Sequence, residues 1–207
     1  MTGDIRGLGE ELLREIGLKE GFNNEEVIKW KSWLQSYSFC SDYTDDPYAW
    51  LTDVLALKSV DSGNYGGVGS IIVDRDGETV AFGHNLMYSP SFRSDLHAEM
   101  VTLNYFEEKN PQITTLKDYT LYTSLESCPM CIIRLISAGI NRVFHVSPDS
   151  IGGMADSINL MPPLWKELSE PQVFAKASCS YELSKAATAI MLINADELLE
   201  ILRKRRL

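Results

Sequence analysis

Residues 119–146 read YTLYTSLESCPMCIIRLISAGINRVFHV, two strand-like segments with an apolar helix between them. Threonine and tyrosine dominate residues 119–123 and favour a strand. Pro129 suits the first turn of a helix, where its missing N–H is not needed, and Gly139 can end that helix. A strand, a helix and a further strand in succession indicate a crossover connection and parallel pairing. The stretch therefore predicts a layered α/β fold.

The same stretch contains a Cys-x-x-Cys pair, Cys128 and Cys131, at the predicted start of its helix. The i, i+3 spacing places both thiols on one face, and the positive end of the helix dipole favours thiolates there. His97 precedes a second helical pattern at residues 100–106. Two helix starts that face each other could enclose one metal ion. An imidazole and two thiolates suit zinc, and three protein ligands leave the fourth position for water.

Glu99 lies two positions after the imidazole. Zinc acidifies a bound water, but hydrolysis also needs a group that moves protons to the substrate and the leaving group. One carboxylate beside the metal can perform these transfers. The sequence therefore predicts Glu99 as the catalytic residue and His97, Cys128 and Cys131 as ligands of one zinc ion.

Other interpretations of the cysteines remain open. A Cys-x-x-Cys pair also fits a structural zinc site, a redox pair or two buried thiols. A closed structural site would need a fourth ligand, for which Cys40 and Cys179 are the candidates, although buried free thiols are the default for both. His84 and His145 are expected to be structural residues rather than ligands.

Residues 47–181 resemble the cytidine deaminase superfamily. Within it they resemble the branch of guanine deaminases, fungal-type cytosine deaminases and tRNA adenosine deaminases. Residues 123–131 look like that branch's Thr-Leu-Glu-Pro-Cys-x-Met-Cys, and residues 67–73 resemble its first core strand. The resemblance implies a three-layer α/β/α fold, a central mixed sheet of about five strands with helices on both faces. Residues 46–207 would form the deaminase domain, and residues 1–45 would be an N-terminal helical extension.

The resemblance also implies substrate contacts. Asn85 follows the second strand, where the family places an asparagine that hydrogen-bonds the substrate ring. Asp149 and Asp156 lie near the position where guanine deaminases have an acidic residue that reads the ring, although each also fits an exposed loop carboxylate. Phe92 could cover a bound base or be an ordinary packed aromatic. Ser127 departs from the family, which usually has proline there, and this puts the pocket wall and the substrate in doubt more than the catalysis.

Apolar periodicity predicts the remaining elements. One amphipathic helix is expected near residues 8–18, and Asn24 can cap a second. A short edge strand is expected at residues 172–175. One C-terminal helix is expected from about Tyr181 through Leu198.

Composition bounds the function. The chain has 207 residues, 44% of them hydrophobic and 23% charged, as in soluble globular domains. No apolar run approaches the roughly 20 residues of a membrane span, and no signal peptide is visible.

The net charge of −10 opposes a large nucleic-acid footprint. Basic residues 203–206 are an exception, which the dipole of a solvated helix end also explains. Two of the four cysteines lie in the metal motif, which favours a reducing, cytoplasmic location.

These observations predict a zinc-dependent hydrolytic deaminase that releases ammonia from a small-molecule base or nucleoside. A guanine-like purine is the first expectation, and with it a role in purine metabolism; cytosine is the next. The resemblance further implies a homodimer. The alternative within enzymes is a tRNA adenosine-to-inosine deaminase, and the non-enzyme alternative is a binding module with a structural zinc.

Overall fold

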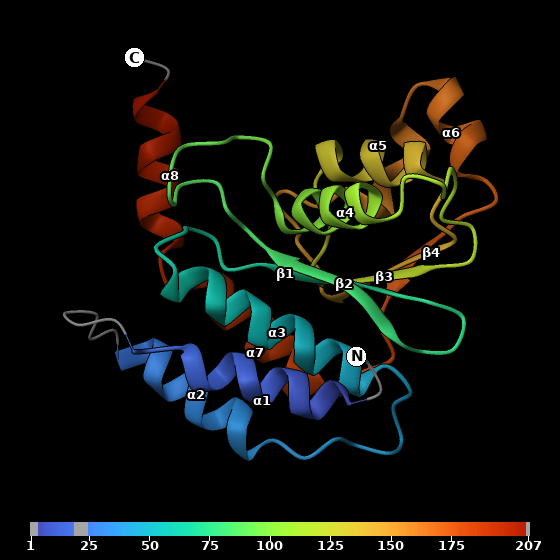
Figure 1. Ribbon diagram of the computed structural model, residues 1–207. Helices are drawn as coiled ribbons and strands as arrows, with labels where there is room; N and C mark the ends of the chain where they lie inside the picture. Colours follow the sequence, from blue (N-terminus) through green and yellow to red (C-terminus); the bar gives the residue numbers. More distant parts are fainter. Residues whose placement is uncertain (1–3, 19–24, 206–207) are drawn as a thin grey trace.

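A central sheet of five strands organises the computed structural model, which describes residues 4–18 and 25–205 (Figure 1). The strands are β1 (Gly69–Val73), β2 (Thr79–His84), β3 (Thr120–Leu125), β4 (Arg142–Ser147) and β5 (Val173–Lys176). Their order across the sheet is β2-β1-β3-β4-β5. The β2-β1-β3 part is antiparallel, while β3, β4 and β5 pair in parallel. The predicted mixed sheet is therefore confirmed.

Helices cover both faces of this sheet. On one face lie α3 (Asp46–Asp61) and α7 (Tyr181–Leu192), and on the other α4 (Ala98–Lys109) and α5 (Pro129–Ala138) (Figure 1). Pro47 stands in the first turn of α3 and Pro129 in the first turn of α5, as their fixed φ allows. Gly139 ends α5 in the left-handed conformation, with φ of 65°. The layers are those predicted.

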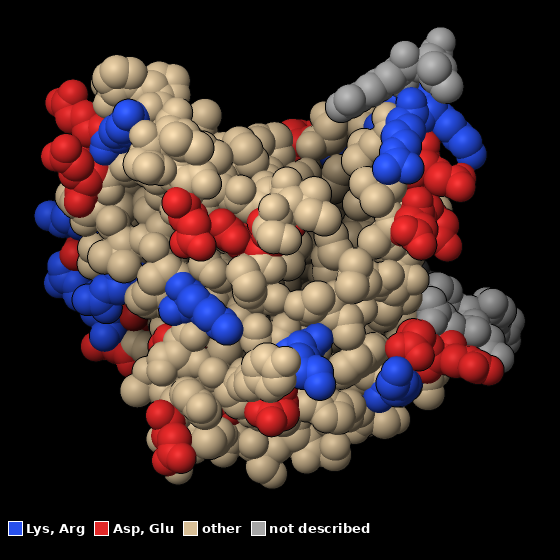
Figure 2. Space-filling model, turned by 180° about the vertical axis from the view of Figure 1, so that it is seen from behind, with Lys and Arg blue, Asp and Glu red and all other residues tan. Residues whose placement is uncertain are grey.

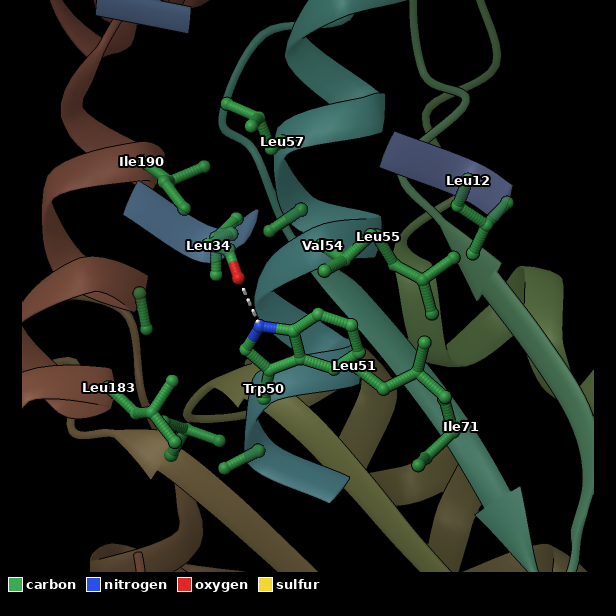
Figure 3. Close-up of a cluster of buried hydrophobic side chains, with 14 of the residues drawn as sticks. Leu12, Leu34, Trp50, Leu51, Val54, Leu55, Leu57, Ile71, Leu183 and Ile190 are labelled. Carbon is green, nitrogen blue, oxygen red and sulfur yellow. Dashed lines mark hydrogen bonds between the residues drawn. The ribbon is translucent and has the colours of Figure 1, made fainter. Parts of the chain in front are cut away.

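Two further helices, α1 (Ile5–Glu15) and α2 (Glu25–Ser36), pack against the outer side of α3. Trp50 lies fully buried between these layers, and its indole Nε1 donates a hydrogen bond of 2.9 Å to the Leu34 carbonyl (Figure 3). Leu12, Leu13 and Leu34 share one hydrophobic cluster with Trp50. The N-terminal helices and the sheet therefore share one core.

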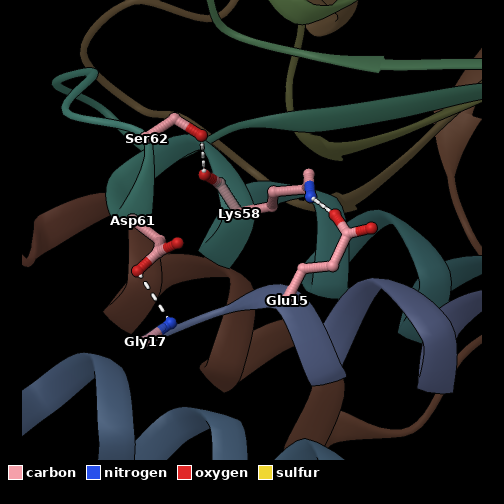
Figure 4. A network of polar contacts seen from close by, with 5 residues as sticks. All are labelled: Glu15, Gly17, Lys58, Asp61 and Ser62. Atoms are coloured by element: carbon pink, nitrogen blue, oxygen red, sulfur yellow. Dashed lines mark hydrogen bonds and ion pairs between the residues drawn. The ribbon is translucent and has the colours of Figure 1, made fainter. Parts of the chain in front are cut away.

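The end of α1 is tied to the end of α3 by polar contacts (Figure 4). The Gly17 N–H donates to Asp61 Oδ1 at 2.9 Å, from a backbone with φ of 77° that suits glycine. Lys58 of α3 forms an ion pair with Glu15, and this hydrogen bond and charge lower the pKa of the Glu15 carboxyl. These contacts fix the point where α1 stops. Asn24, the predicted cap of the second helix, lies outside the described residues.

The prediction of one C-terminal helix is wrong. The chain forms α7 and then a separate α8 (Ala195–Lys204), with a break at Asn194. Asn194 Oδ1 accepts from the Gly66 N–H at 3.1 Å, and its Nδ2 donates to the Asn64 carbonyl at 3.0 Å. These bonds hold the break against the loop before β1, so α8 projects past the edge of the layers (Figure 1).

The segment between β4 and β5 contains the 3₁₀ helix η1 (Ala155–Leu160) and α6 (Pro163–Ser169). Met161 is buried there, and Trp165 packs against the same small cluster. Within the described ranges, every helix is too short or too polar to cross a bilayer.

Candidate active site

Two helix starts meet at the centre of the site. His97 is the N-cap of α4 and Cys128 is the N-cap of α5, both with extended backbone, while Cys131 lies in the first turn of α5. The Cys128 Sγ atom lies 3.6 Å from His97 Nδ1 and 3.7 Å from Cys131 Sγ. The ligand atoms of the three residues all lie within 4.8 Å of one another. The three predicted ligands are therefore brought together.

These separations fit one tetrahedral zinc ion. Zinc bonds sulfur at about 2.3 Å and imidazole nitrogen at about 2.0–2.1 Å, which places two ligand atoms roughly 3.6–3.8 Å apart. The two distances above agree with that range. Cys40 and Cys179, the candidates for a fourth ligand, are not members of the cluster found among the described residues. The donor set is therefore that of an open zinc site.

The electrostatics of the cluster favour a cation. A hydrogen bond from Cys131, and then one from His97, lower the pKa of the Cys128 thiol to about 4. The reciprocal bond to Cys128, together with burial, raises the pKa of Cys131. The hydrogen bond to Cys128 raises the pKa of His97. One thiolate is thus stabilised at the helix ends before any metal is bound.

Glu99 lies beside these ligands in the first turn of α4, and only 3% of it is exposed. Burial raises the pKa of its carboxyl. The Ser127 hydroxyl donates to Glu99 Oε1 at 2.6 Å. A buried carboxyl with a raised pKa suits a group that must both accept and release protons near neutral pH.

A cavity of about 190 Å³ opens above the cluster. Its lining includes His97, Glu99 and Cys128, so two of the three predicted ligands and the carboxylate face one space. Leu198 and Leu202 of α8 line the same cavity. The C-terminal helix therefore forms one of its walls.

Asn85, the residue expected to bind the substrate ring, lines the cavity and is 5% exposed. Its Oδ1 accepts from the Ala98 N–H at 2.8 Å, and its Nδ2 donates to the Gly66 carbonyl. The side chain thus ties the end of β2 to the start of α4 and to the loop before β1. Its position in the wall is held from both sides.

Of the other three residues predicted to contact the substrate, one lines the cavity and two do not. Asp149 lines the cavity, with Oδ1 accepting the N–H groups of Ile151 and Gly152 at 3.0 Å. Asp156 is exposed, and Phe92 is 48% exposed and packs against Tyr88. Neither is part of the lining, as far as the described chain defines it.

Several residues that line the cavity were not predicted from the sequence, among them Glu126, Leu198 and Leu202. Glu126, 7% exposed, accepts from the backbone N–H of Asp149 at 3.0 Å and of Asp156 at 3.4 Å, so it anchors the loop after β4. Leu198 and Leu202 carry an apolar i, i+4 pattern, which signals a buried stripe but not what the stripe covers.

His84 and His145 stand apart from the metal cluster, as expected. Burial lowers the pKa of both imidazoles.

Charged side chains are dispersed on the face seen in Figure 2, where blue and red groups alternate. Blue side chains gather at the end of α8, close to red ones on the same helix. A notch faced mainly by uncharged side chains separates α8 from the block of α5 and α6. This face therefore carries no broad basic surface among the described residues.

Residues 49–147 match the family described as the cytidine and deoxycytidylate deaminase zinc-binding region. This span contains His97, Glu99, Cys128 and Cys131. The chain belongs to the cytidine deaminase superfamily. The superfamily region is zinc-binding, and the three ligand atoms of this member fit that ion.

The chain is similar to two kinds of protein, tRNA adenosine deaminases and guanine deaminases. A chloroplastic tRNA(adenine(34)) deaminase of Arabidopsis thaliana is 29% identical over 144 residues, 67% of this chain. A solved structure from studies of A-to-I editing by tRNA:A34 deaminases has a TM-score of 0.58 and 23% identity, covering 69% of this chain and 97% of the other. A guanine deaminase of Nitrosomonas europaea has a TM-score of 0.56 and 17% identity, covering 87% and 96%. These two structures support the fold of this superfamily member.

The superfamily member spans only part of its curated relatives. The match covers 11% of the plant protein and 55–62% of three bacterial tRNA-specific adenosine deaminases.

Proposed function

We propose that this chain is a zinc-dependent hydrolase that removes an amino group from a nucleobase or nucleoside and releases ammonia. The observation that carries the proposal is the buried Glu99 carboxylate, which lies beside the three-residue ligand cluster and lines the same cavity as His97 and Cys128. His97, Cys128 and Cys131 would hold the ion. When bound, zinc would act as a Lewis acid and lower the pKa of a water molecule bound to it.

Glu99 would carry the protons. It would accept one proton from the attacking water and deliver it to a ring nitrogen. It would then take the second proton from the hydroxyl added to the ring carbon and pass it to the amine, which leaves as ammonia while the carbonyl forms. Its burial and raised pKa support both directions of transfer. Asn85 would orient the ring, because its amide retains one N–H and one oxygen lone pair beyond the two bonds that hold it.

The cavity favours a small substrate. The α8 residues Leu198 and Leu202, together with Met191, place apolar surface over the ligands, which suits the face of a free ring. Asp149 adds a carboxylate in the wall, whose Oδ2 could accept an N–H of a purine. A guanine-like purine is therefore the first candidate and cytosine the next.

A second candidate is deamination of adenosine in tRNA. The curated relatives that support it are tRNA adenosine deaminases. The last turn of α8 carries Arg203 and Lys204, and Arg205 directly after it lies over Phe92 and near Tyr88. Cations beside aromatic rings suit a nucleotide strand. The net charge of −10 opposes this candidate. The non-enzyme candidate is a binding module with a structural zinc. It does not explain the buried Glu99, because a structural zinc site needs only its ligands and Glu99 is not one of them.

The test is ammonia release by zinc-loaded protein. The panel holds guanine, adenine, cytosine, their nucleosides and a tRNA anticodon stem-loop, with Glu99→Ala as the control. We expect release from a small molecule, abolished in Glu99→Ala while zinc and fold are retained. Release from the RNA alone, falling steeply with salt, would favour tRNA editing. Unchanged turnover in Glu99→Ala would overturn the proton-transfer role.

We also propose that the chain acts as a homodimer. Ile151 is 98% exposed, Leu160 76% and Leu164 57%, and these apolar side chains belong to one segment between β4 and β5. These side chains are the candidates for an apolar patch that a second copy of the chain would cover. Sedimentation of the wild type against Leu160→Asp tests this, and a monomeric wild type would contradict it.

A further inference from the structure

Ser127 lies at the junction between β3 and α5, directly before the first cysteine ligand. It is 2% exposed, and its Oγ atom lies 2.6 Å from Glu99 Oε1. Its carbonyl also accepts the Met154 N–H at 3.0 Å. The backbone that carries the hydroxyl is therefore held in place, and the hydroxyl reaches the carboxylate that the proposed function uses.

The direction of this hydrogen bond follows from the chemistry of its partners. An ionised carboxylate only accepts, so the serine O–H donates. Hydrogen bonds to an ionised acceptor are short and strong, and 2.6 Å falls in that range. A proline, which the family resemblance leads one to expect at this position, could make no such bond. The contact is thus a property of this chain's own residue.

We propose that Ser127 is a positioning residue for Glu99. Its hydroxyl holds Oε1 and leaves Oε2 as the oxygen that exchanges protons with water and substrate. The proposal rests on the proposed function, because it assigns Ser127 a role in the same proton transfers. A glutamate side chain has several rotatable bonds, and fixing one oxygen removes most of the orientations that would carry the other away.

A neighbouring serine provides a matched comparison. Ser124 is also fully buried, but its Oγ accepts the Gly69 N–H of β1 at 3.1 Å and does not line the cavity in the described chain. Removing that hydroxyl breaks a bond between β3 and the start of β1. Removing the Ser127 hydroxyl breaks a bond to Glu99. The two variants therefore separate general loss of packing from loss of carboxylate orientation.

The first test measures kcat, KM and bound zinc for Ser127→Ala, Ser127→Thr and Ser124→Ala, with the substrate that the panel identifies. We expect Ser127→Ala to lower kcat by about tenfold or more, with KM and zinc content near those of the wild type. Ser127→Thr, which keeps a hydroxyl, should recover most of kcat. Ser124→Ala should lower thermal stability and keep kcat. Equal kcat in Ser127→Ala and wild type would overturn the proposal, as would equal losses in the alanine and threonine variants.

A second measurement does not require turnover. Crystal structures of the zinc-loaded wild type and Ser127→Ala should show the Glu99 carboxylate in one orientation in the first and displaced or divided between orientations in the second. An unmoved carboxylate in the variant would overturn the positioning role. If Ser127→Ala does not fold, Ser127→Cys replaces the hydroxyl with a weaker donor of similar size and serves both measurements. A wild type that is inactive on the whole panel would refute the proposed function alone, and the two structures would still decide how Glu99 is held.

Discussion

The guanidinium of Arg205 lies over the ring of Phe92, 3.4 Å from its centroid. It also approaches the Tyr88 ring, at 5.4 Å. The end of α8 is thereby joined to the loop between β2 and α4, while Asn194 joins the start of α8 to the loop before β1. The helix that covers the cavity is attached at both ends.

We predict that Arg205→Ala weakens this cover. A cation–π contact at an exposed site contributes about 0.5–1 kcal/mol, so KM should rise by a factor of roughly 2–5 with little change in kcat. Phe92→Ala should have a similar effect, and the double variant should be little worse than either alone. Arg203→Ala removes the same charge from the same exposed end and serves as the control. An equal rise of KM in that control would assign the effect to charge rather than to the stacked pair.

Leu198 and Leu199 are adjacent on α8 but differ in what they face. Leu198 lines the cavity, while Leu199 is 45% exposed. We predict that Leu198→Ala raises KM by about tenfold, because an apolar contact of about 1–2 kcal/mol with the bound ring is lost. Leu199→Ala should leave KM and kcat unchanged. Steady-state kinetics of the two variants check this, and indistinguishable variants would contradict a role for α8 in the wall.

Alkylation should reveal the metal ligands. At pH 7 the Cys128 thiol is ionised, because its pKa is lowered to about 4, and it is half-buried, whereas Cys131 is fully buried. We expect iodoacetamide to modify Cys128 of the zinc-free protein well before Cys131, and zinc to protect Cys128. Cys40 is also half-buried and lies outside the metal cluster, so its reaction should not depend on zinc. Mass spectrometry of the peptides gives the three rates. A Cys128 rate that zinc does not change would contradict its assignment as a ligand.

Asp53 of α3 provides a prediction about pH. Its carboxyl is fully buried, and neither oxygen has a hydrogen-bond partner in the part of the chain that is described. Burial, and then the charge of Asp46, raise its pKa well above 3.8. The folded state therefore keeps a proton that the unfolded state loses above pH 3.8, so this residue makes the protein less stable as pH rises from there toward its folded pKa.

We predict that Asp53→Asn, which cannot ionise, raises the free energy of unfolding by about 1–3 kcal/mol at pH 8 and by much less at pH 4. Asp46→Asn is the contrast, because Asp46 accepts bonds from Tyr37, Cys40 and Ser180 and its replacement should destabilise the fold. Urea unfolding at the two pH values measures both variants. A gain that does not grow with pH would show that Asp53 titrates normally in the folded protein.

Features that depend on residues close together in the sequence could be predicted from the sequence alone. Pro129 and Gly139 marked the ends of α5, and the i, i+3 cysteines placed two thiols on one helix face, because each effect depends on neighbours within one or two turns. The two helix starts only allowed His97 and Cys128 to meet at one metal ion, and the family resemblance supported that meeting. Its geometry depends on how α4 and α5 pack on the sheet, which no local pattern contains.

Contacts between distant residues escaped prediction. The break between α7 and α8 depends on bonds from Asn194 to residues 64 and 66, about 130 positions away. Without that break, Leu198 would continue α7 instead of reaching the cavity. The sequence alone shows Ser127 only as a departure from the proline usual in the family. Its hydrogen bond to Glu99 could not be predicted, because Glu99 lies 28 positions earlier and only the fold brings the two side chains together.

The position of α8 outside the core affects how this protein can change over evolutionary time. Among its described residues Ala195 alone is buried, so most of the helix can be rewritten without disturbing the packing around Trp50. The zinc ligands and the part of the cavity wall that α8 forms are thus encoded in separate segments of the chain. A library that varies Leu198 and Leu202 should yield mostly folded proteins, and new substrate preferences can arise there without a prior gain in stability.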